Sequence, residues 1–186
     1  MLIDLTLRVN GGMIEQLSGH KAAAFGHLGT HIDVGHIKFP VEFVKRKAIL
    51  FDVRSVKNRD IGLQDVDILQ VDKEMFVAFY TGFSDQVEYA SVKYFAEHPQ
   101  LAHELINKLL ERGVSIIGVD CAGIRRGGEH APTDQYCAER GVFIVENLSN
   151  MGRLLRGGKQ NHFEAYTFPV NFSDMTGLPC RVVGEM

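Results

Sequence analysis

Residues 101–120 read LAHELINKLLERGVSIIGVD, and this stretch gives the clearest structural signal in the chain. Between residues 99 and 112, five apolar side chains recur at the spacing of one helical face: Leu101, Leu105, Ile106, Leu109 and Leu110. Gly113 is suited to end this helix, because glycine adopts the left-handed conformation without strain. The apolar run at residues 114–119 then predicts a buried strand.

The same order of helix, glycine and strand occurs a second time. Thr133, after Pro132, is the expected N-cap of a helix over residues 133–140, and Gly141 precedes an apolar run at residues 142–145. Strands that alternate with helices favour parallel pairing under a helical cover. Further strands are expected at residues 3–7, 48–53 and 76–80. No repeat or linker divides the chain, so we expect one α/β domain spanning residues 1–186.

The composition excludes several classes of protein. With 45% hydrophobic and 23% charged residues, the chain resembles ordinary folded proteins, so extensive disorder is excluded. A net charge of -3 without a long basic block argues against nucleic acid as a partner. No run approaches the ~20 apolar residues of a membrane span, and Asp4 interrupts the N-terminus, so we expect a cytoplasmic protein without a membrane partner.

Three of the eight histidines lie within the stretch His27-Leu28-Gly29-Thr30-His31-Ile32-Asp33-Val34-Gly35-His36. Glycines and β-branched residues disfavour a helix here. An extended chain instead places His27, His31 and Asp33 on one face. Imidazoles and a carboxylate without thiolates suit Zn²⁺, Mn²⁺ or Fe²⁺ in a hydrolytic centre. We therefore predict a metal site, with simple hydrogen bonding on a half-exposed strand as the alternative.

Two acids follow neighbouring predicted strands. Glu146 comes directly after residues 142–145, and Asp120 comes directly after residues 116–119. A carboxylate at the end of a buried strand is costly unless it is paired or binds a metal. Glu146 is therefore the best distant candidate ligand, although an ordinary edge carboxylate is the alternative. Asp120 is expected to orient a ligand or to line the pocket.

The chain resembles the cyclase-like metal-dependent hydrolases, a family that includes the bacterial kynurenine formamidases. Residues 27–33 match the family signature H-x-G-T-H-x-D at every fixed position. Five other segments resemble family elements in the family's order: Ile3-Asp4-Leu5-Thr6, Tyr80-Thr81-Gly82-Phe83-Ser84, residues 114–120, residues 141–148 and Leu178-Pro179-Cys180-Arg181-Val182. The resemblance therefore extends over the full length.

This resemblance implies a single-domain three-layer swivelling β/β/α fold with a mixed central sheet. It implies a site for one or two divalent metal ions, Zn²⁺ or Mn²⁺, with His27, His31, Asp33 and Glu146 as ligands. Asp33 would be able to bridge two ions. It also implies a homo-oligomer, either a dimer or a tetramer.

Two departures from the family pattern concern site residues. The family's D-x-P-x-H segment ends in an acid/base histidine, whereas Asp33 to His36 lacks the proline and is one residue shorter. A bulge at Gly35 would return His36 to the site, so His36 is the predicted catalytic residue. The family's histidine ligand, twelve residues before its glutamate, is replaced by Asp134. Asp134 is the predicted substitute ligand, and His130 is the alternative.

Together these features predict a metal-dependent amidohydrolase, arylformamidase-like or cyclase-like. It would cleave or close a C–N amide bond in a small-molecule substrate through a metal-activated water. The alternative is a non-catalytic small-molecule-binding protein that retains the fold with a degenerate metal site. A metal-assisted isomerase or lyase would use the same ligands. Phe25, Phe39 and Phe83 are candidates for an aromatic pocket or for the core.

Overall fold

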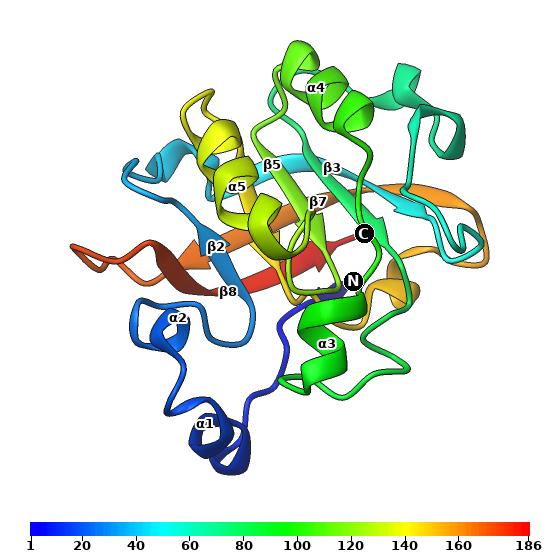
Figure 1. Ribbon diagram of the computed structural model, residues 1–186. Helices are drawn as coiled ribbons and strands as arrows, with labels where there is room; N and C mark the ends of the chain where they lie inside the picture. Colours follow the sequence, from blue (N-terminus) through cyan, green and yellow to red (C-terminus); the bar gives the residue numbers. More distant parts are fainter.

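A computed structural model describes residues 1–186 and contains one mixed sheet of eight strands (Figure 1). The strands are β1 (Leu2–Asp4), β2 (His31–Asp33), β3 (Lys45–Asp52), β4 (Phe76–Tyr80), β5 (Ile116–Val119), β6 (Phe143–Glu146), β7 (Gln160–Pro169) and β8 (Gly177–Glu185). Their order is β1-β8-β2-β6-β5-β4-β3-β7, and β7 also pairs with β8. The sheet therefore closes into a barrel-like ring, with β1 attached to β8.

The parallel strands expected from the sequence are present. β3, β4, β5 and β6 run parallel to one another, whereas β2 and β7 pair with their neighbours in the antiparallel sense. The α/β class and the mixed sheet are thus confirmed. The division into three layers stays an expectation from the resemblance, because the strands all belong to one closed sheet.

The α-helices are α1 (Gly11–Leu17), α2 (Lys21–Ala24), α3 (Val92–Glu97), α4 (His103–Arg112) and α5 (His130–Ala138). Short 3₁₀ helices lie at Val41–Phe43, Leu63–Asp65, Ile68–Gln70, Gly127–Glu129 and Met151–Leu154. Gly113 ends α4 with a φ of 68°, as the sequence predicts. None of these helices combines the length and apolar composition needed to cross a bilayer.

The start of α5 differs from its prediction. The helix begins at His130 rather than at Thr133, because the 3₁₀ turn Gly127–Glu129 leads directly into it. Pro132 lies in the first turn, where a missing backbone N–H costs nothing. The earlier start places His130 and Asp134 one helical turn apart, so both side chains face the same direction.

Alternate residues of the strands pack into two separate cores. Residues from all eight strands fill the interior of the ring, including Ile32, Leu50 and Phe143. The opposite face of β3 to β6 packs under α4 and α5 through residues such as Leu105 and Cys137. Both helices lie over the parallel strands in Figure 1. The parallel strands are therefore packed on both faces, and this packing positions the carboxyl end of β6.

Candidate metal centre

The short strand β2 brings the histidine motif to Glu146. β2 is paired on both sides, with β6 and with β8, and its register sets His31 directly opposite Glu146. His31 Nε2 lies 3.4 Å from Glu146 Oε2 and 3.4 Å from Asp33 Oδ1. All three side chains are at least 95% buried, so the residues predicted from two distant segments do meet.

His27 reaches the same place by a different route from the one predicted. It lies in a turn before β2, not in an extended strand, and Gly26 and Gly29 both have positive φ angles there. A Cβ on Gly26 would lie only 1.8 Å from the Gly177 carbonyl oxygen, so only glycine fits. The turn brings His27 Nδ1 to 2.8 Å from Asp33 Oδ1.

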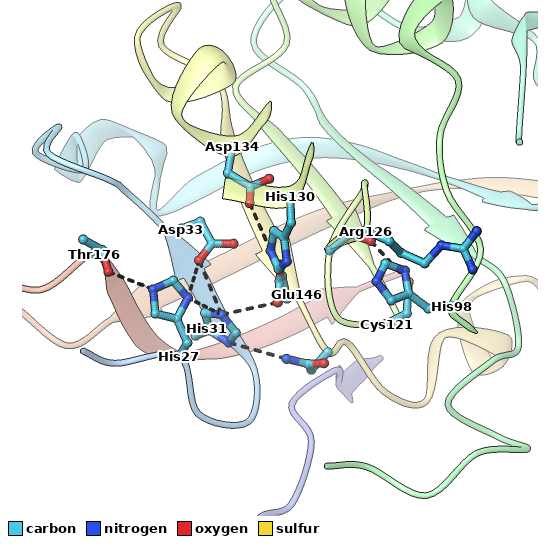
Figure 2. Close-up of polar contacts among 12 residues, drawn as sticks. His27, His31, Asp33, His98, Cys121, Arg126, His130, Asp134, Glu146 and Thr176 are labelled. Atoms are coloured by element: carbon cyan, nitrogen blue, oxygen red, sulfur yellow. Dashed lines mark hydrogen bonds and ion pairs between the residues drawn. The ribbon is translucent and has the colours of Figure 1, made fainter. Parts of the chain in front are cut away.

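Helix α5 supplies two further side chains. His130 Nε2 lies 2.8 Å from Glu146 Oε1 and 3.0 Å from Asp134 Oδ2. The sequence offered Asp134 as the substitute ligand and His130 as the alternative, and the fold brings both to the cluster. Figure 2 shows the two side chains of α5 facing the group formed by β2 and Glu146.

The residues of this cluster fit a divalent metal. They form two groups whose ligand atoms lie within 4.8 Å of one another: His27, His31 and Asp33 in one, and Asp33, His130, Asp134 and Glu146 in the other. Oδ2 of Asp33 and Oδ1 of Asp134 are buried without a hydrogen-bond partner, whereas Asp33 Oδ1 faces the imidazoles of His27 and His31. Adjacent ligands of a tetrahedral Zn²⁺ lie roughly 3.3 Å apart, close to the separations observed between these side chains.

Electrostatics also favour a cation at this place. Burial would lower the pKa of His31, but the charges of Asp33 and Glu146 raise it to about 9. Burial raises the pKa of Asp134 to about 7 and also raises that of Glu146. Although burial opposes ionisation, the neighbouring imidazoles hold the pKa of Asp33 well below its usual range. Without an ion, protons on His31 and His130 offset the buried carboxylates, and a divalent cation would replace them.

His36 lies apart from this cluster. It is exposed and has no hydrogen bond or ion pair with any of the six side chains. Gly35 does adopt a positive φ of 53°, as the expected bulge requires. The turn nevertheless places His36 in the lining of an adjacent groove rather than among the candidate ligands. Its catalytic role stays a prediction.

Asp120 has a different role from the one expected. Its Oδ1 accepts hydrogen bonds from the backbone N–H of Thr81 at 2.8 Å and from the Thr81 hydroxyl at 2.7 Å. It belongs to neither group of candidate ligands. Asp120 therefore anchors the loop after β4.

The groove beside the cluster has a volume of about 1270 Å³. Phe25, Phe39, Phe168 and Phe172 supply much of its apolar lining. Thr176 connects the groove to the cluster, because its hydroxyl lies 2.9 Å from His27 Nε2 (Figure 2). Phe83 instead packs near Tyr94. Sequence reasoning did not find Thr176, since a single threonine in a loop gives no signal.

Comparison with known proteins gives the family of the chain and agrees with its fold. The model of the putative cyclase family matches residues 3–125, about two thirds of the chain. The chain belongs to this putative cyclase family, which confirms the resemblance found in the sequence. No curated protein sequence matches it.

Solved structures with the same fold cover nearly the whole chain. One is described as a potential metal-dependent hydrolase with cyclase activity (22% identity, TM-score 0.74, 99% of this chain and 96% of that chain). Another is a predicted metal-dependent hydrolase from Bacillus stearothermophilus (21% identity, TM-score 0.71, 99% and 97%). A third is isatin hydrolase A from Labrenzia aggregata bound to benzyl benzoate (16% identity, TM-score 0.74, 99% and 93%). At these identities the likeness establishes the fold.

Proposed function

We propose that this chain is a metal-dependent hydrolase that cleaves a C–N amide bond in a small molecule. The observation that supports this most is the convergence of three imidazoles and three carboxylates, some with unpaired buried oxygens, beside an open groove. The structural relatives described as metal-dependent hydrolases and as an isatin hydrolase are consistent with amide hydrolysis.

The residues that would hold the metal are His27, His31, Asp33, Asp134 and Glu146, together with His130. A bound divalent cation, Zn²⁺ or Mn²⁺, supplies Lewis acidity that activates water and polarises an amide carbonyl. Asp33 belongs to both groups of candidate ligands, so it is the residue suited to bridge two ions.

The remaining parts of the site provide binding and proton transfer. The phenylalanines of the groove offer apolar contact to the body of a substrate, whose amide would face the ligands through the side lined by Thr176. His36 lies in this lining and is exposed, so its imidazole is free to give a proton to a departing nitrogen. Arylformamides and cyclic aryl amides are the substrate types to test first, since an aromatic body fits this lining.

The test is metal content per chain, by elemental analysis of chelator-treated protein reconstituted with Zn²⁺ or Mn²⁺. The wild type should hold one or two ions, and His31→Ala and Asp134→Ala should lose metal together with amidase activity. His162→Ala is the matched control, because His162 is an exposed imidazole on β7. A wild type that takes up no metal would overturn the hydrolase and support a non-catalytic binding protein.

We further propose a homo-oligomer, a dimer or a tetramer, as the working form. Several large apolar side chains outside the groove are exposed, among them Ile14, Leu69 and Val92. Contact between copies would remove this apolar surface from water. Light scattering on the purified chain should give a multiple of the monomer mass, and a monomer at micromolar concentration would contradict the proposal.

A further inference from the structure

We propose that the two motif histidines face the metal through opposite ring nitrogens, His27 through Nδ1 and His31 through Nε2, and that Thr176 and Asn147 are the positioning residues that enforce this. The inference rests on the proposed metal-dependent function. It is based on the hydrogen-bond partner of the ring nitrogen that points away from the cluster in each histidine.

The orientation of His31 follows from its outer partner. His31 Nδ1 lies 2.9 Å from the backbone carbonyl oxygen of Gly29. A carbonyl oxygen only accepts hydrogen bonds, so Nδ1 must hold a hydrogen. In the neutral ring the lone pair is then on Nε2, the nitrogen that faces Asp33 and Glu146.

Asn147 holds in place the Gly29 carbonyl group, which determines that the hydrogen of the His31 ring is on Nδ1. Its amide Nδ2 donates to the same Gly29 oxygen at 2.8 Å, and its Oδ1 accepts from the Tyr94 hydroxyl at 2.8 Å. The Gly29 carbonyl oxygen only accepts, so it is the NH₂ end of the amide that faces it. Asn147 is 3% exposed and has a positive φ of 58°, so its side chain is confined between strand end and turn. The Gly29 carbonyl therefore cannot turn away without breaking a buried network.

His27 has the reverse arrangement. Its Nδ1 faces the cluster, 2.8 Å from Asp33 Oδ1 and 3.1 Å from His31 Nε2. Its Nε2 faces the Thr176 hydroxyl at 2.9 Å. With the Nδ1 lone pair directed to a cation, the ring hydrogen is on Nε2 and donates to Thr176 Oγ1.

The backbone holds the Thr176 hydroxyl in place. The Thr176 carbonyl oxygen accepts from the backbone N–H groups of Val34 at 2.9 Å and Gly35 at 3.1 Å. The next residue, Gly177, donates to the Phe25 carbonyl oxygen at 3.0 Å. The loop before β8 is thus hydrogen-bonded to the chain just before the histidine motif, at Phe25, and just after it, at Val34 and Gly35. Thr176 is therefore a fixed acceptor rather than a mobile surface hydroxyl.

The first test is NMR spectroscopy of protein labelled with ¹⁵N in histidine and loaded with Zn²⁺. Long-range couplings between ring protons and nitrogens identify which nitrogen binds zinc. We expect zinc on Nδ1 of His27 and on Nε2 of His31. Zinc bound through the same nitrogen of both rings would overturn the inference and leave the proposed function intact. Failure to bind zinc at all would overturn both.

The second test compares matched variants of Thr176. Thr176→Val keeps the shape but removes the acceptor, so zinc affinity should fall about tenfold and the His27 signal should shift. Thr176→Ser restores the acceptor and should restore both. Thr167→Val is the control, because the buried Thr167 hydroxyl on β7 has no partner. Unchanged zinc affinity and an unchanged His27 signal in Thr176→Val would contradict the role of Thr176.

Discussion

Asp120 and Glu146 lie near the carboxyl ends of the adjacent parallel strands β5 and β6, Glu146 as the last residue of β6 and Asp120 one residue beyond β5, and both are almost completely buried. Asp120 Oδ1 accepts from a backbone N–H and from a hydroxyl, both belonging to Thr81. Glu146 instead lies against two imidazoles, those of His31 and His130. The two acids lie one residue apart in the register of the two strands, and different side chains face them.

The difference shows what makes a buried carboxylate available to a metal. The Thr81 N–H and hydroxyl give hydrogens to Asp120 Oδ1, and a backbone N–H has no lone pair with which to bind a cation beside this acid. An imidazole offers either a hydrogen or a lone pair, so the partners of Glu146 are themselves candidate metal ligands. The side chains and backbone groups that face each acid therefore distinguish Asp120, which anchors a loop, from Glu146, which is a candidate metal ligand.

The largest expected effect tests this comparison directly. Glu146→Gln keeps the size of the side chain and removes its charge, so zinc affinity should fall by at least about 100-fold. Asp120→Asn makes the same chemical change in the buried acid after the neighbouring strand and should alter zinc affinity by less than about threefold. Calorimetric titration of chelator-treated protein with Zn²⁺ measures both. Equal losses in the two variants would refute the distinction.

A second prediction concerns His36, which lies beyond the end of β2 rather than in the cluster. His36→Ala should keep its full metal content, because the side chain has no contact with the candidate ligands. If His36 transfers a proton, kcat should fall about 100-fold on the best amide substrate. Metal analysis and initial rates on the same preparation separate the two effects. Undiminished kcat would remove His36 from the mechanism.

The smallest expected effect is on stability. Burial raises the pKa of Asp120 to about 6, from an ordinary value of 3.8. The folded state therefore binds more protons than the unfolded state in this interval, and its stability falls as pH rises from about 4 to 6. Asp120→Asn should remove this loss and stabilise the metal-free protein by about 1–3 kcal/mol at pH 8 but little at pH 4. Urea unfolding at the two pH values measures it, and destabilisation at pH 8 would show that Asp120 needs its charge.

Local signals predicted the parallel half of the molecule well. The helical face ending at Gly113 and the apolar run after it lie next to each other in sequence, so tertiary structure had little to change. β7 was missed, although Phe163, Ala165 and Thr167 alternate there as the buried face of a strand. This two-residue period in the sequence is sufficient to predict β7, which closes the ring between β3 and β8.

The sequence predicted which residues form the cluster more accurately than it predicted the backbone conformation that brings them together. The sequence identified His27, His31 and Asp33, but it placed His27 in a strand, whereas glycines at positive φ bend the chain into a turn. The place of His130 depended on where α5 begins, which the preceding 3₁₀ turn decides. Thr176 comes from a loop that pairing between β2 and β8 brings close, and no local pattern reports such a contact.

The closed ring has a consequence for how the protein folds. β2 has only three residues, and both of its partners, β6 and β8, are synthesised long after it. Such a short segment cannot persist as a strand alone, and contacts between distant parts of a chain form slowly. On the ribosome the histidine motif therefore emerges early and remains unstructured until β8 pairs with it. The proposed metal site is thereby tied to completion of the fold, because an unfinished chain presents the histidines without bringing them to Glu146.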